Sequence, residues 1–79
     1  MTKELYIMLK TSAEADKAKA LLSLELLGNK AVGIGDHSTE DFYKNAEEAL
    51  MILVDADDRL ATLEKYFTQP KINLNEKTF

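Results

Sequence analysis

The sequence predicts an α+β fold, a split βαβ sandwich with the element order β-α-β-β-α-β. Three observations carry this prediction. The runs 5–9 and 49–54 are apolar at every position, as expected of strands that are covered on both faces of a sheet. Stretches rich in Ala, Leu, Lys and Glu follow the first run and predict helix. Gly28-Asn29 and Pro70 then stand where helices typically end.

The first half of the chain is predicted to hold a strand, a helix and a second strand, over residues 3–10, 12–27 and 30–34. Thr11 is the expected helix cap, and Glu14 stands three residues further on, as in a capping box. Gly28 is expected to end the helix in the left-handed conformation.

The second half is predicted to hold a loop, a third strand, a second helix and a tail, over residues 35–45, 47–55, 59–67 and 70–79. A short helix over 40–44 is an alternative for part of the loop. Asp57 or Asp58 is the expected cap of the second helix. The tail is an edge strand or a flexible terminus, outside a single α+β domain over 1–69.

The two strands with apolar residues on both faces are the first and the third. These are the central strands of a ferredoxin-like sheet, which is why we prefer that topology. The alternative is a small three-layer α/β sheet, which would follow if 38–48 formed a full helix.

The length and composition predict one domain that associates with itself. A chain of 79 residues buries only about 60% of the surface that its unfolded form exposes, and small domains offset this with disulfides, metals or oligomerisation. The chain has no cysteine and one histidine, so thiolate sites and disulfides are excluded. We therefore predict a homodimer, whose partner would also cover the open face of the sheet.

The charge balance argues against nucleic acid as a partner. The formal net charge is −4, and the ten basic residues are scattered, whereas phosphate contacts require clustered positive charge. The longest apolar run is too short to cross a membrane, and no secretory signal pattern begins the sequence. We predict a cytoplasmic protein that binds neither membrane nor nucleic acid.

The residues that favour chemistry are few. Asp55, Asp57 and Asp58 follow the third predicted strand and offer carboxylates to Mg²⁺ or Ca²⁺, with His37 as a further ligand, base or pH sensor. Helix capping accounts for the aspartates equally well. The Gly33-Ile34-Gly35-Asp36 segment lets backbone approach a phosphate, but it lacks a phosphate-binding lysine and fits a turn. We therefore predict no catalytic residue, metal or cofactor, and no enzyme.

The loop offers a candidate site for protein partners. Phe42 and Tyr43 are adjacent aromatics in an acidic stretch with Asp36, Glu40 and Asp41. Exposed aromatic residues are enriched at protein interfaces. One of the two rings folding back onto the core is an equally good interpretation.

The chain also resembles a family. The segments 12–15, 19–22, 27–32 and 54–58 (SAEA, KALL, LGNKAV and VDADD) are similar to small bacterial ferredoxin-like signal-transducing domains of unknown function, over about residues 3–67. More distantly, the chain is similar to ferredoxin-like regulatory domains that bind small effectors at subunit interfaces. The resemblance implies a ferredoxin-like fold and no catalytic residue.

Three hypotheses about function follow. The first is a non-enzymatic regulatory or adaptor module that binds a protein or a small effector through residues 35–48 and a dimer interface. The second is an acidic inhibitor, of the kind that phages or mobile elements encode, which covers a basic nucleic-acid-binding surface. The third is a metal-binding domain that uses the aspartate run, Asp55, Asp57 and Asp58.

Overall fold

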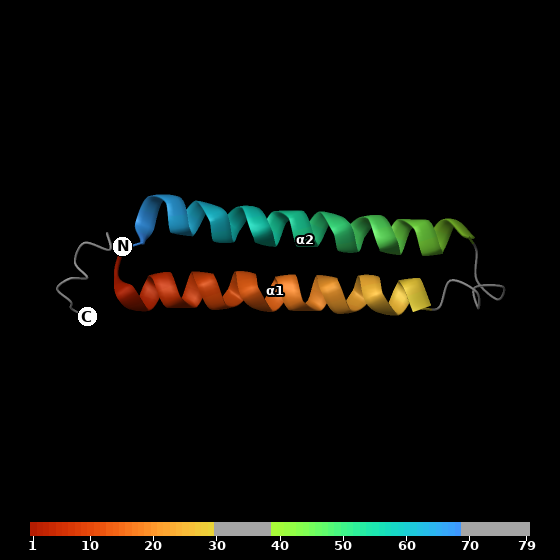
Figure 1. Cartoon of the computed structure of the whole chain (residues 1–79), viewed down its shortest axis with the longest axis horizontal. Coiled ribbons are helices and arrows are strands. Elements are labelled where there is room, and N and C mark those ends of the chain that lie inside the picture. Colours follow the sequence, from red (N-terminus) through yellow and green to blue (C-terminus); the bar gives the residue numbers. More distant parts are fainter. Residues whose placement is uncertain (30–38, 69–79) are drawn as a thin grey trace.

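The computed structural model is a hairpin of two long antiparallel helices, α1 (Lys3–Asn29) and α2 (Thr39–Phe67), which lie side by side along their whole length (Figure 1). The structure describes residues 1–29 and 39–68. At 1.5 Å per residue, the 27 residues of α1 and the 29 of α2 extend about 40 Å and about 43 Å. The two helices are therefore matched in length.

The predicted ferredoxin-like α+β sandwich is wrong. None of the described residues lies in a strand, and the predicted strands 3–10 and 47–55 are both parts of long helices. The three-layer α/β alternative fails for the same reason. The predicted strand 30–34 and the tail 70–79 lie outside the described residues. The predicted loop 35–45 is wrong over 39–45, which form the start of α2 and include the short helix 40–44 given as the alternative. A run of consecutive apolar residues fits a buried strand and a helix equally well, and here the helix is formed.

Uninterrupted helix propensity explains the two long helices. The sequence has no glycine or proline from residue 1 to 27 or from 36 to 69, and both stretches are rich in Ala, Leu, Glu and Lys. Because helix growth adds one hydrogen bond per residue after a costly first turn, a helix extends until something stops it. The helices predicted over 12–27 and 59–67 are confirmed, each as the second part of a longer one.

The first turn of α1 is capped by Thr2. Its Oγ1 accepts a hydrogen bond from the Leu5 amide at 3.1 Å, and its carbonyl accepts one from the Tyr6 amide at 3.0 Å. Thr11, the cap predicted from the sequence, lies in the middle of α1. Asp57 and Asp58 likewise lie in the middle of α2 and cap nothing.

The C-terminal ends of both helices agree with the sequence prediction. α1 ends at Asn29, and α2 ends at Phe67, shortly before Pro70. The Thr68 hydroxyl donates a 2.6 Å hydrogen bond to the Glu64 carbonyl, which satisfies one of the last carbonyl groups of α2. Gly28 is part of α1 and does not have a positive φ, so its predicted left-handed conformation is wrong.

Small residues at seven-residue spacing hold the two helices together. Five apolar side chains are buried among the described residues: Ala13, Ala20, Ala49, Ala56 and Leu63. Tyr6, Leu27 and Phe42 are half-buried and continue the same spacing to the ends of the helices. We call these eight residues the seam. A seven-residue repeat keeps one stripe of each helix facing its neighbour, and alanine lets the two backbones approach closely.

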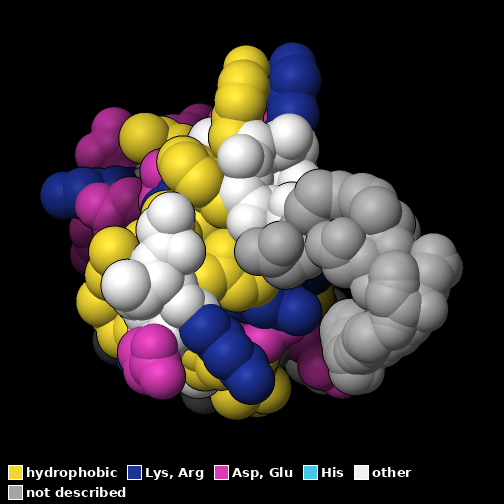
Figure 2. Space-filling view, turned by 90° about the vertical axis from the view of Figure 1, so that its left-hand side faces the viewer, with side chains coloured by type: hydrophobic (Ala, Val, Ile, Leu, Met, Phe, Trp, Pro, Cys, Tyr) yellow, Lys and Arg dark blue, Asp and Glu magenta, His cyan; other side chains and the backbone are white. Residues whose placement is uncertain are grey.

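The large apolar side chains lie mostly outside the seam. In the described part of the chain, 15 of them are exposed, among them Leu22 (55%), Leu50 (52%) and Met51 (68%). Figure 2, which faces the end where α1 begins and α2 ends, shows apolar side chains at the surface between charged ones. The hairpin therefore buries little of its own apolar surface.

Candidate protein-interaction surface

The seam divides the hairpin into two sides. Residues three positions after seam residues lie on one side, which we call the Arg59 side: Leu9, Asp16, Ser23, Asn45, Ile52, Arg59 and Tyr66. Residues four positions after seam residues lie on the other side, the Lys17 side: Lys10, Lys17, Leu24, Ala46, Leu53, Leu60 and Phe67. Because the helices are antiparallel, each side receives the same positions from both of them.

An ion-pair network joins the helices on the Arg59 side. Arg59 Nη2 lies 2.7 Å from Asp16 Oδ2 on α1, and Arg59 Nε lies 3.0 Å from Asp55 Oδ2, one turn away on α2. The hydrogen bond to Asp16 is the main cause that raises the pKa of the Arg59 guanidinium above its ordinary value. Since water reaches this network, its main effect is to orient the arginine rather than to stabilise the fold.

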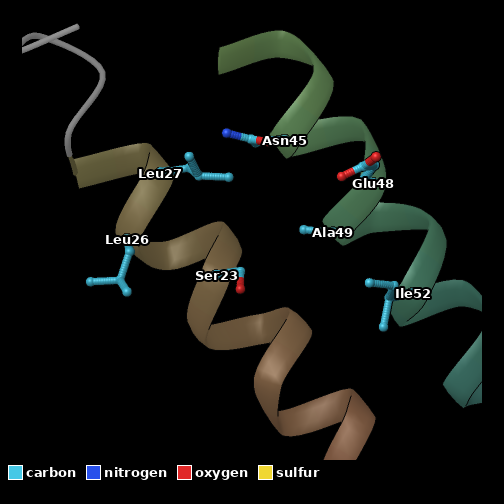
Figure 3. A pocket seen from close by; sticks show the side chains of 7 residues that line it. All are labelled: Ser23, Leu26, Leu27, Asn45, Glu48, Ala49 and Ile52. Atoms are coloured by element: carbon cyan, nitrogen blue, oxygen red, sulfur yellow. The ribbon is translucent and has the colours of Figure 1, made fainter. Parts of the chain in front are cut away.

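An open groove lies on the Arg59 side, toward the end of the hairpin where α1 ends and α2 begins. Its volume is about 400 Å³, and its lining is Ser23, Leu26, Leu27, Asn45, Glu48, Ala49 and Ile52. In Figure 3, Leu27 points across the groove toward α2, and Asn45 and Ala49 point back toward α1. Leu26 points outward at the edge of the groove. The floor is therefore apolar, with Glu48 as the charged group on its wall.

A second groove of about 280 Å³ lies on the same side, at the other end of the hairpin. It is lined by Leu9, Ser12, Asp58, Arg59, Thr62 and Leu63. Asp16 lies between the two grooves along α1, and its ion-pair partner Arg59 lines the smaller groove. From Leu9 to Leu26 is 17 residues along α1, or about 25 Å at 1.5 Å per residue. The Arg59 side thus offers two apolar contact points on either side of a charged centre.

The Lys17 side combines leucines with separated charges. Leu24, Leu53 and Leu60 are half-buried there, so each packs partly on the neighbouring helix and partly faces outward. Lys17 Nζ on α1 lies 3.2 Å from Asp57 Oδ1 on α2. A shallow groove of about 310 Å³ lies further along, lined by Tyr6, Lys10, Glu14, Leu60, Leu63, Glu64 and Thr68.

The structure does not bring the candidate metal ligands together. Asp55 pairs with Arg59, and Asp57 pairs with Lys17 on the opposite side of the hairpin. Positions two apart on a helix point in nearly opposite directions, which explains the separation. Among the described residues, no group of three His, Cys, Asp or Glu side chains is placed to hold a metal ion. His37 and the Gly33–Asp36 segment lie outside the described residues.

The predicted partner-binding aromatics have different environments. Phe42 is half-buried in the seam, whereas Tyr43 beside it is 58% exposed. Their ring centroids are 6.0 Å apart, in an edge-on arrangement. Glu40 and Asp41 lie in the first turn of α2, where the helix dipole favours negative charge. Asp36 lies outside the described residues.

The sequence interpretation missed Arg59, Asp16 and Lys17. Asp16 and Arg59 are 43 residues apart, so only the antiparallel pairing of the helices makes them neighbours. The available signal was the seven-residue spacing of alanines, 13 and 20 in one stretch and 49 and 56 in the other. That spacing indicates a helix pair and would have divided the charged residues between two sides.

Comparisons with family models, curated proteins and solved structures find no match for this chain. They do not test the resemblance to bacterial signal-transducing domains, but the ferredoxin-like fold that it implied is contradicted by α1 and α2. Neither helix in the described part of the chain is long and apolar enough to span a bilayer. The cytoplasmic location stays a prediction.

Proposed function

We propose that this protein is a non-catalytic binding module that docks an amphipathic helix of another protein on its Arg59 side. One observation carries the proposal: two apolar grooves lie on that side, at either end of the Arg59–Asp16 pair. A helix that lies along a groove is recognised through apolar side chains at helical spacing. Such a helix needs about 17 residues to reach both grooves.

The charge of α2 indicates what kind of helix fits. α2 carries eight carboxylates against three basic side chains, whereas four lysines balance four carboxylates in α1. Glu48 lies on the wall of the larger groove and Asp58 on the wall of the smaller one. A partner helix with basic residues beside its apolar stripe matches this surface, because opposite charges steer association and favour the correct partner.

Site-specific photocrosslinking in the cells that make the protein tests the proposal. A photoreactive phenylalanine analogue at Leu26 or Leu9, both at the grooves, is expected to give a discrete adduct with another protein. The same analogue at Glu47, an exposed residue of α2 that lines neither groove, is the matched control. Ile52→Glu is expected to abolish the adduct by placing a charge in the larger groove.

The outcomes are distinguishable by mass. An adduct that contains only two copies of the 8.9 kDa chain, or one that forms equally well from Glu47, contradicts the proposal. The proposal is supported if Ile52→Glu loses the Leu26 adduct while its circular dichroism shows unchanged helicity. The variant has then altered the groove and has left the fold intact.

The acidic inhibitor is the second candidate, and the uneven charge favours it specifically. The carboxylates of α2 include clusters at its start and its middle, which suit a basic surface. This hypothesis predicts that affinity for the partner falls steeply as salt rises from about 50 mM to about 200 mM. Binding through the apolar grooves predicts a smaller fall in affinity, because apolar burial supplies most of the affinity and the basic residues of the partner helix only add to it. One salt titration against the crosslinked partner therefore separates the two.

A further inference from the structure

The Lys17 side is a second exposed apolar surface, and it is independent of the grooves on the Arg59 side. Leu24, Leu53 and Leu60 are half-buried along it. Leu21 (48%), Leu50 (52%) and Ile7 (50%) stand next to them, one position after seam residues, and are exposed. Apolar side chains from both helices therefore form one face that the hairpin itself does not cover.

The charges on this face are sorted by helix. α1 contributes Lys3, Lys10 and Lys17, with Glu14 as the single carboxylate beside them. Lys10 and Lys17 come four positions after seam residues, and Lys3 lies seven positions before Lys10 on the same face. α2 contributes Asp57 and Glu64, and none of its basic residues occupies these positions. The face is therefore mainly positive along α1 and negative along α2.

We propose that a second copy of this chain covers the Lys17 side and forms a four-helix bundle. Two hairpins can stack face to face with two-fold symmetry in two ways. In one, α1 packs on the partner's α1, which sets lysine against lysine. In the other, α1 packs antiparallel on the partner's α2, which sets the lysines against the partner's Asp57 and Glu64.

Charge complementarity selects the second arrangement. The two-fold axis then runs parallel to the helices, so each Lys17 is level with its own Asp57 and with the partner's Asp57. Toward the end of the hairpin where α1 ends, Leu21 and Leu24 meet the partner's Leu50 and Leu53. Toward the other end, where the face of α1 is mainly charged, Lys10 lies level with the partner's Glu64. α1 and α2 differ by two residues in length, so the two faces match from end to end, as in up-and-down four-helix bundles.

The seam buries little apolar surface, and this is the reason to expect that two copies associate. Of the five apolar side chains that are buried in the described ranges, four are alanines, which remove little apolar surface from water. Small domains with so little core rely on disulfides, metals or further copies. The chain has no cysteine. A second copy on the Lys17 side buries leucines on both chains at once.

Analytical ultracentrifugation of the full chain is the primary test. We expect twice the mass of the 8.9 kDa chain at micromolar concentration. Leu50→Lys is expected to weaken the dimer by about 100-fold or more, because the change occurs twice in a two-fold interface and each copy loses a buried leucine. Leu22→Lys is the matched control, since Leu22 is equally exposed but lies on α1 away from this face.

A second variant keeps the test decisive if Leu50→Lys loses helicity. Leu21→Lys changes the same face from α1 and is expected to have the same effect. The proposal is overturned if the wild-type chain is a monomer at all accessible concentrations. It is equally overturned if Leu22→Lys dissociates the dimer while Leu50→Lys and Leu21→Lys leave it intact.

Cysteine crosslinking tests the arrangement, and the chain provides a background without native cysteines. A mixture of the Lys17→Cys and Asp57→Cys proteins is expected to form a disulfide-linked heterodimer on mild oxidation. Lys17→Cys alone is expected to stay uncrosslinked, because the two α1 helices are diagonal in the bundle. The proposed packing would be overturned if Lys17→Cys formed a disulfide-linked homodimer efficiently and the mixture formed no heterodimer of the two variants. None of these results depends on the grooves of the Arg59 side. The dimer and the docking of a partner helix are therefore tested independently.

Discussion

The seam and the outer surface of this hairpin divide the apolar side chains by size. The seam is built around four alanines and one leucine that are buried, whereas 15 large apolar side chains of the described residues are exposed. Most single domains have the opposite distribution, with their large aliphatic residues inside. The seam therefore sets the distance and register of the two helices, and the larger apolar groups remain available for contacts between molecules.

The largest expected effect comes from placing a charge in the seam. Ala56 is fully buried, so Ala56→Glu puts an unpaired carboxylate between the helices and is expected to cost about 3 kcal/mol or more of the free energy of unfolding. Ala61→Glu, at an exposed position of the same helix, is the matched control and is expected to change little. Thermal unfolding by circular dichroism, at one fixed protein concentration, measures both. Equal melting temperatures for the two variants would mean that the seam does not hold the helices together.

A smaller effect is expected from truncating Leu63, the one large side chain that is buried in the part of the chain that the structure describes. Leu63 is 7% exposed, and Leu63→Ala is expected to cost about 2 to 3 kcal/mol through lost burial and the cavity left behind. Met51 is 68% exposed on the same helix, and Met51→Ala is expected to cost less than about 0.5 kcal/mol. Urea unfolding gives both values. A larger loss for Met51→Ala would show that the outer surface, not the seam, carries the stability.

The sequence predicted where the helices end better than where they begin. Gly28-Asn29 and Pro70 were recognised as stop signals, and the regular helical spacing over 12–27 was assigned correctly. The run from Leu5 to Leu9 was assigned as a strand because every position in it is apolar, which removes the periodicity that separates helix from strand. Its 3.6-residue pattern becomes visible only when the run is joined to the helix that follows it.

The interaction surface was less predictable than the helices, for a geometric reason. Asp55 and Asp57 are neighbours in the sequence, yet they face opposite sides of the hairpin because they are two positions apart on a helix. Asp16 and Arg59 are distant in the sequence and form an ion pair at 2.7 Å. Both facts depend on knowing that residues 47–55 are helical and that α2 pairs antiparallel with α1. Adjacency in the sequence therefore grouped the wrong residues.

The N-terminal end of the seam gives a test of intermediate size. Tyr6, the first seam residue, donates its amide hydrogen bond to Thr2, the cap of α1. Thr2→Ala is expected to cost about 1 kcal/mol and to speed hydrogen exchange at the Leu5 amide. Thr11→Ala, at an exposed position in the middle of α1, is expected to be neutral or to stabilise by a few tenths of a kcal/mol, because alanine is the better helix former. If Thr11→Ala lowered the stability more than Thr2→Ala, the helix would begin after Thr11, as the sequence predicted.

The smallest expected effect is that of Gly28→Ala, at the C-terminal end of α1. Whether this change raises or lowers the free energy of unfolding shows whether Gly28 is helical or left-handed. Gly28 follows the last seam residue of α1, and the position that a Cβ would take there has open space around it, with no neighbouring atom within 4 Å. Gly28→Ala is therefore expected to stabilise the protein by about 0.5 kcal/mol, since alanine loses less backbone freedom on entering a helix. Had Gly28 the left-handed conformation expected of a helix stop, alanine would be strained there and the same change would destabilise by about 1 kcal/mol. Urea unfolding of the single variant distinguishes a gain from a loss, and a loss would place the end of α1 before Gly28.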